Sequence, residues 1–99
     1  MPDVPPQAHA TILREVRELK NKLAAVGDGT DRRLHHLCFE AADSTLGQCH
    51  SAISETRDKA QIVEELRKAY EALGRWLNGP AASAVVPTRE QLQKLWGRL

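Results

Sequence analysis

Residues 30–78 read TDRRLHHLCFEAADSTLGQCHSAISETRDKAQIVEELRKAYEALGRWLN, and how they fold determines the architecture of the chain. They contain no proline and are rich in Ala, Leu, Glu, Arg and Lys, which have high helix propensity. Helix-breaking residues interrupt the sequence on both sides: Pro2, Pro5, Pro6, Gly27 and Gly29 before the stretch, and Gly79, Pro80 and Pro87 after it. The sequence therefore predicts an all-α fold.

Three arrangements of this stretch are open. Polar residues fill positions 54–59, and a turn there would give helices over about 8–26, 31–54 and 58–78. A turn at Gly47 would give a short and a long helix, although a glycine inside a helix costs only about 1 kcal/mol. One continuous helix would be about 70 Å long and would need a dimer to cover its apolar side. We favour the turn at 54–59, because the three helices then match in length.

The two halves of the stretch differ in what they can bury. The apolar face of the first half is made largely of small side chains: Leu34, Leu37, Cys38, Ala41, Ala42, Thr45, Leu46, Cys49, Ala52 and Ile53. Small side chains let helices approach closely but bury little area, at ~25 cal/mol per Å². The second half is strongly amphipathic, with Ile62, Val63, Leu66, Ala69, Tyr70, Leu73, Trp76 and Leu77 on one side. Asp58, followed three residues later by Gln61, is typical of a helix start.

The apolar pattern of residues 8–26 predicts the first helix. Its apolar positions have the spacing of a coiled-coil seam: Ile12, Val16, Leu19, Leu23 and Val26. Gly27 suits the left-handed conformation that follows a helix end. Asp28 or Thr30 can cap the next helix through a side-chain oxygen. The short connection predicts that the next helix returns antiparallel.

The chain divides into four predicted segments: an irregular lead over 1–7, a helical bundle domain over 8–78, a linker over 79–87 and a C-terminal helix over 88–99. Pro5 or Pro6 fits the first turn of a helix. Thr88 and Gln91 have the spacing of a capping box, which predicts that the last helix begins there. The predicted fold is an antiparallel three-helix bundle, or a long helical hairpin, with a short C-terminal helix. We expect a dimer, because a core of this size gives marginal stability.

Composition and motifs exclude several classes of protein. The formal net charge of +1 gives no argument for nucleic acid or an anionic membrane. No apolar run approaches the ~20 residues of a membrane span, and no signal peptide is visible. The motifs GxxxxGK[ST], GxGxxG, HExxH and GxSxG are absent from the sequence. We therefore expect a cytoplasmic protein that is not an enzyme and has no cofactor.

Four residues are weak candidates for a metal site: His35, Cys38, Cys49 and His50. On one helix Cys38 and Cys49 lie ~16 Å apart along the axis, whereas zinc ligands lie ~2.0–2.3 Å from the ion. Only a hairpin at 43–47, or antiparallel pairing of two copies of the helix, would bring the cysteines together. We predict no metal site and two buried cysteines that pack as small apolar residues.

The leading functional hypothesis is a non-enzymatic protein–protein interaction module, a small homodimerising regulator, adaptor or chaperone-like protein. Its expected partners are a second copy of the chain and another protein bound through the C-terminal helix. The predicted interaction surface combines the small-residue face with that helix: Leu34, Cys38, Ala41, Thr45, Cys49, Leu92, Leu95 and Trp96.

Two alternatives rest on narrower observations. The C-terminal half is mildly basic, which would suit a nucleic-acid-binding regulator. The residues that such a regulator would use are Arg67, Lys68, Arg75, Arg89, Lys94 and Arg98. A metal-binding protein would instead depend on the Cys/His candidates alone. The overall charge of the chain favours neither a membrane nor a nucleic acid as its partner.

Overall fold

The computed structural model describes residues 3–99, and this part of the chain is helical with no strand. Its elements are α1 (Pro6–Ala24), α2 (Arg32–Ala41), the π-helical turn η1 (Ala42–Gly47), α3 (Gln48–Ser54), α4 (Lys59–Leu73), the 3-10 turn η2 (Gly74–Trp76) and α5 (Ala82–Gly97). Because α2, η1 and α3 follow without a break and η2 extends α4, residues 3–99 form four helical rods. The predicted all-α class is confirmed.

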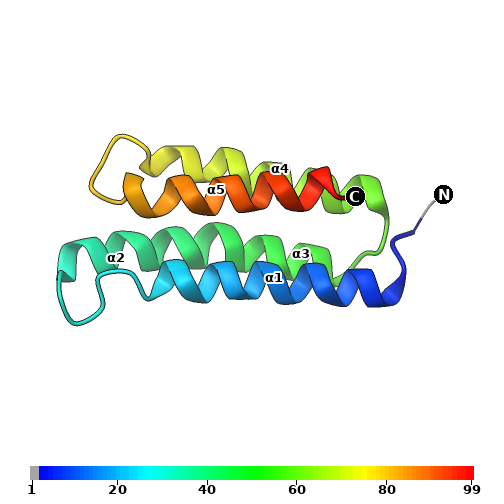
Figure 1. The fold of residues 1–99 in the computed structure, drawn as a ribbon, viewed down its shortest axis with the longest axis horizontal. Coiled ribbons are helices and arrows are strands. Elements are labelled where there is room, and N and C mark those ends of the chain that lie inside the picture. Colours follow the sequence, from blue (N-terminus) through cyan, green and yellow to red (C-terminus); the bar gives the residue numbers. More distant parts are fainter. Residues whose placement is uncertain (1–2) are drawn as a thin grey trace.

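The four rods pack as an antiparallel bundle. Figure 1 shows α1 alongside the α2–η1–α3 rod and α4 alongside α5, with the α1–α2 and α4–α5 connections at the same end. The two hairpins contact each other through α3 and α4 and through α1 and α5. The predicted three-helix bundle with an appended helix is therefore corrected to a four-helix bundle that measures 45 × 22 × 18 Å. The predicted dimer stays a prediction.

One apolar core runs along the bundle and takes side chains from every rod. The largest fully buried residues include Val16, Leu23, Leu46, Ile53, Ile62, Leu66, Leu73, Val85 and Leu92. Burial of this kind contributes ~1.5–3 kcal/mol for each large aliphatic side chain. Among residues 3–99, no helix combines the length and the apolar character that crossing a membrane would require.

The N-terminal lead is shorter than predicted. Pro6 occupies the first position of α1, where its missing N–H leaves no helical hydrogen bond unmade. The irregular part therefore ends at Pro5, and residues 1–2 of the predicted lead lie outside the described residues. Val4 is buried, and its backbone N donates a hydrogen bond to the Arg57 carbonyl at 2.7 Å. The lead is thus fixed against the turn before α4.

The α1–α2 connection depends on a glycine in the left-handed region. Gly27 has φ +78°, as the sequence predicts. The cap of α2 is Asp31, whose carboxylate accepts a hydrogen bond from the Leu34 N–H at 3.0 Å, and the prediction of Asp28 or Thr30 is wrong. The reason is that a second left-handed glycine, Gly29, prolongs the turn.

The turn between α3 and α4 lies where the polar residues 54–59 predict it. Asp58 caps α4 by accepting a hydrogen bond from the Gln61 N–H at 3.3 Å, as predicted. Thr56 supports this turn, because its hydroxyl donates to Gln61 Oε1 and accepts from the Asp58 N–H. The alternative break at Gly47 does not occur, because the backbone continues through it as the π-helical turn.

The π-helical turn has a local cause. The Ser44 hydroxyl donates to the Glu40 carbonyl at 2.7 Å, and the Thr45 hydroxyl donates to the Ala41 carbonyl. Hydroxyls that bond to carbonyls four residues earlier compete with the α-helical ladder. Two in succession favour the wider π pattern, which often marks a functional region.

The last helix begins earlier than predicted. It starts at Ala82, so the expected linker over 79–87 is irregular only over 79–81. Pro87 lies inside the helix, and the Thr88 hydroxyl donates to the Ala84 carbonyl at 3.1 Å instead of capping. The predicted capping box is therefore wrong. Ala81 and Val85 are buried in the bundle, and this burial holds the first turns helical.

Candidate functional site

The predicted interaction surface lies inside the chain's own core. Cys38, Ala41, Thr45 and Cys49 are buried, on a rod that packs against α1 and α4. Leu92 and Leu95 of α5 are buried as well, while Leu34 and Trp96 are half-buried. The Trp96 ring meets the Tyr70 ring edge-on, with centroids 5.3 Å apart. These side chains close the bundle and leave little free surface for a partner, so the predicted surface requires correction.

The four candidate metal ligands are not brought together. Cys38 and Cys49 face the core at different levels of the rod, and Cys49 Sγ donates to the Glu65 carbonyl at 3.5 Å. The His35 ring bonds through Nδ1 to the Val26 carbonyl at 3.2 Å. Within residues 3–99, no group of three or more His, Cys, Asp or Glu is placed to hold a metal ion.

The buried thiol of Cys49 is expected to lower the free energy of unfolding as the pH rises into the alkaline range. Burial, and then the Glu65 carboxylate, raise its pKa from 9.0 to about 12. Below pH 9 both the folded and the unfolded chain keep the proton, so the thiol has no effect there. Between about pH 9 and 12 only the unfolded chain releases it, so the free energy of unfolding is expected to fall by about 1.4 kcal/mol per pH unit.

Urea unfolding between about pH 8 and 11 measures this slope, and Cys49→Ala provides the comparison. The Cys49→Ala variant is less stable at neutral pH but has no thiol to titrate. Its free energy of unfolding is therefore expected to fall less steeply with rising pH. Equal slopes in the two proteins would assign the alkaline loss to other groups.

The basic residues of the C-terminal half do not form one free patch. The Arg89 guanidinium lies 3.8 Å from the centroid of the Tyr70 ring, and its Nε donates to the Tyr70 carbonyl at 2.9 Å. Arg98 forms an ion pair with Glu15 at 2.8 Å. Two of the six candidate nucleic-acid contacts therefore serve to attach α5 to α4 and α1.

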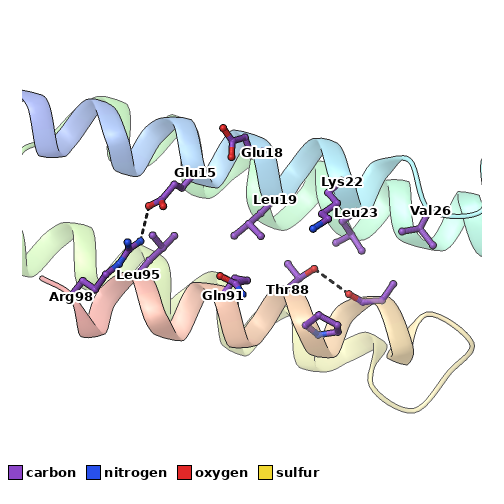
Figure 2. A pocket seen from close by; sticks show the side chains of 12 residues that line it. Glu15, Glu18, Leu19, Lys22, Leu23, Val26, Thr88, Gln91, Leu95 and Arg98 are labelled. Atoms are coloured by element: carbon purple, nitrogen blue, oxygen red, sulfur yellow. Dashed lines mark hydrogen bonds and ion pairs between the residues drawn. The ribbon is translucent and has the colours of Figure 1, made fainter.

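A groove lies between α1 and α5, with a volume of about 790 Å³. Its apolar lining consists of Leu19, Leu23, Val26, Ala84, Pro87 and Leu95. Its polar lining consists of Glu15, Glu18, Lys22, Thr88, Gln91 and Arg98. Figure 2 shows Glu15 and Leu19 of α1, and Thr88 and Leu95 of α5, pointing toward the space between the two helices, while Glu18 lies at the edge of α1 away from α5. We call this hollow the α1–α5 groove.

The groove exists because the two helices present unequal side chains. The predicted seam contributes Leu19 and Leu23 from α1 and Val26 from just after it, while on α5 the facing residues include the small Ala84 and Thr88. Small residues opposite leucines leave space that the fold does not fill. The α1 side could be predicted from its spacing. The α5 side could not, because the sequence predicts a linker at Ala84.

The charges on the groove differ between its ends. At one end the Glu15–Arg98 ion pair spans from α1 to α5 (Figure 2). Glu18 pairs along its own helix with Arg14 at 3.8 Å. Toward the other end Lys22 projects into the groove, and it forms no ion pair with any residue in 3–99. The groove thus has one neutralised end and one cationic end.

A second hollow lies between α1 and the start of α3, and we call it the basic cleft. It has a volume of about 200 Å³ and is lined by Arg17, Lys20, Asn21, Gly47, His50 and Ser51. Arg17 Nη2 lies 3.5 Å from His50 Nε2. Burial, and then the positive charges of Arg17 and Lys20, lower the pKa of His50 below its usual value of 6.5. The imidazole is therefore neutral at pH 7 and accepts from the guanidinium.

Comparison with protein-family models, curated proteins and solved structures finds no match to this chain. The two hollows are therefore the basis for a functional assignment. In the part of the chain that the structure describes, no hydrogen bond joins the Ser51 hydroxyl to His50 in the cleft, and the Thr88 hydroxyl of the groove donates to the Ala84 carbonyl. The α1–α5 groove offers an apolar floor with charged margins, and the basic cleft offers hydrogen-bond donors.

Proposed function

We propose that this chain is a non-enzymatic protein–protein interaction module that binds one amphipathic helix of another protein in the α1–α5 groove. The observation that carries the proposal is the apolar floor of the groove, where the half-buried Leu19 and Val26 flank the buried Leu23. Most other large apolar side chains pack inside the bundle, and among residues 3–99 only Phe39 and Val86 are strongly exposed. Recognition of a helix by a groove between two helices uses the same ridge-and-groove packing that holds helices together.

The dimensions of the groove define its ligand. From Glu15 to its end at Ala24, α1 rises about 14 Å. Val26 lies just beyond that end, so the floor is about three helical turns long. A bound helix would present large aliphatic side chains at positions i, i+4 and i+7 to this floor. Ala84 and Thr88 on the other wall are small enough to let its backbone come close. The ligand is therefore a short helix with one narrow aliphatic face.

The charge on the groove selects among such helices. Glu15 and Arg98 neutralise each other at one end. Lys22, at the other end, has no anionic partner among residues 3–99. A helix with Asp or Glu beside its aliphatic face would pair with this ammonium, and one with Lys or Arg would be repelled. We infer that the partner helix is acidic at the end that lies over Lys22.

Reversing the charge of Lys22 is expected to exchange the preference of the groove. The probes are two synthetic helices of about three turns with the same leucine face, one flanked by Glu and one by Lys. The wild-type chain is expected to bind the Glu peptide about fivefold tighter, and Lys22→Glu to bind the Lys peptide better by a similar factor. Fluorescence anisotropy of labelled peptides gives both affinities.

Lys94→Glu is the matched control, because Lys94 is exposed on α5 outside the groove. It makes the same change in net charge and is expected to leave the preference unaltered. Unchanged selectivity in Lys22→Glu would contradict the proposal. Light scattering tests the predicted homodimer: a dimer that Leu19→Gln dissociates would assign the groove to a second copy and overturn the partner helix.

A further inference from the structure

We propose that the basic cleft is a second binding site, separate from the α1–α5 groove, and that it takes the phosphate group of a small phosphate monoester. The cleft lies where α1 crosses the junction between the π-helical turn and α3. Its volume of about 200 Å³ exceeds the ~30 Å³ share of one water molecule several times over. It is therefore large enough for a tetrahedral oxyanion.

The residues around the cleft form a set of hydrogen-bond donors. Arg17, Lys20, Asn21 and Ser51 carry guanidinium, ammonium, amide and hydroxyl groups, and His50 adds an imidazole. No carboxylate lines the cleft. Two permanent positive charges, with three neutral groups able to donate, match an anion with several acceptor oxygens.

The two cations of the cleft are not neutralised by a direct ion pair among residues 3–99. The Asp43 carboxylate lies near Lys20 on the side of an adjoining hollow, since an added Cβ at Gly47 would stand 3.7 Å from Lys20 Nζ and 3.9 Å from Asp43 Oδ1. Within the part of the chain that the structure describes, neither Arg17 nor Lys20 takes part in an ion pair. Lys20 lies across Gly47 of the π-helical turn, where an added Cβ would stand 3.6 Å from its Cε. Arg17 is turned toward His50 at 3.5 Å. A bound oxyanion would neutralise both cations, and it would favour protonation of the His50 ring, which the cations now oppose.

An adjoining hollow limits what can be attached to the phosphate. It has a volume of about 550 Å³ and is lined by Lys20, Asp43, Ser44, Gly47, Gln48 and Ser51. This space would receive the substituent of a phosphate ester. The Asp43 carboxylate would repel a second phosphate placed there. The geometry therefore points to a monoester with a polar, uncharged substituent, in preference to a diphosphate.

Titration with inorganic phosphate, glycerol 3-phosphate and pyrophosphate at constant ionic strength tests the site. NMR of the histidine ring protons gives the affinity and the pKa of His50 together. Three variants are compared: Arg17→Gln and Lys20→Gln in the cleft, and Arg67→Gln on the exposed face of α4 as the matched control. All three are expected to keep the fold, because Arg17 and Arg67 are exposed and Lys20 is only half-buried. Arg17→Gln and Lys20→Gln are each expected to weaken phosphate binding by about 10- to 100-fold, the effect of one charge-assisted hydrogen bond.

The expected results are a raised pKa of His50 in phosphate, glycerol 3-phosphate binding at least as tightly as inorganic phosphate, and weaker binding of pyrophosphate. Lys22→Glu in the groove is expected to leave phosphate binding unchanged, which separates the two sites. If Arg67→Gln weakened phosphate binding as much as the cleft variants do, or if phosphate bound without changing the pKa of His50, the binding would be general charge attraction. Either result would overturn the proposal. Tighter binding of pyrophosphate would overturn the choice of a monoester.

Discussion

Replacing Gly27 with alanine is expected to lower the free energy of unfolding by about 2–4 kcal/mol. Gly27 has φ +78°, a conformation that L-residues with a Cβ adopt only at a cost. An added Cβ would also stand 2.8 Å from the His35 backbone N and 3.0 Å from the Asp31 carbonyl O. Both contacts are with backbone at the start of α2, so α2 would have to move away from α1.

Gly29→Ala separates the two contributions to this loss. Gly29 has the same φ of +78°, but an added Cβ there meets no atom within 4 Å. Alanine at this position is expected to cost only about 1 kcal/mol, the conformational part alone. Urea unfolding of the two variants measures the difference, which reports how closely the two helices approach. Equal losses would show that the contact with α2 has no energetic weight.

The turn residues of this chain were predictable where a single residue suits the backbone conformation or the helix cap that the turn requires. Gly27 follows the last residue of the α1 seam, and only glycine adopts its conformation readily. Asp58 stands between a polar stretch and a strongly amphipathic segment, so its role as a cap follows from local sequence. The cap of α2 was less determined, since Asp28, Thr30 and Asp31 all carry suitable oxygens. The choice depends on how far Gly29 prolongs the turn.

Tertiary contacts decided the rest of the fold. Residues 79–87 have the small side chains and prolines of a linker, yet α5 begins at Ala82. Burial of Ala81 and Val85 outweighs the hydrogen bond that Pro87 cannot make, and local sequence carries no sign of that burial. The α1–α5 groove depends on this early start. The spacing of apolar residues in the sequence could therefore not predict the groove.

The basic cleft was hidden from sequence for a different reason. Arg17 and Lys20 share one face of α1, and this spacing is visible in the sequence. His50 and Ser51 come from a helix more than thirty positions later, and packing alone brings them together. In the sequence His50 stands beside Cys49 as a weak metal-ligand candidate, but adjacent residues on a helix point in different directions. The Ser44–Thr45 pair before Gly47 was the one local sign of an irregular helix.

The largest loss outside the turns is expected for Leu92→Ala in α5, at about 3–5 kcal/mol. Leu92 is fully buried, and truncation of such a leucine removes its burial energy and leaves a cavity in the core. Gln93→Ala is the matched control, because Gln93 is its exposed neighbour, and a change there is expected to stay within about 0.5 kcal/mol. Urea unfolding followed by circular dichroism measures both variants.

This comparison tests whether α5 is the fourth rod of the bundle or a tethered helix. A helix on a flexible linker would lose little when Leu92 is truncated, because the core would not depend on it. A loss below about 1 kcal/mol would therefore contradict the four-helix bundle. Such a result would mean that α5 is not docked. The α1–α5 groove would then lack one wall, since Ala84 and Thr88 face α1 only while α5 is docked. The stability of Leu92→Ala thus decides whether a partner helix meets a preformed groove.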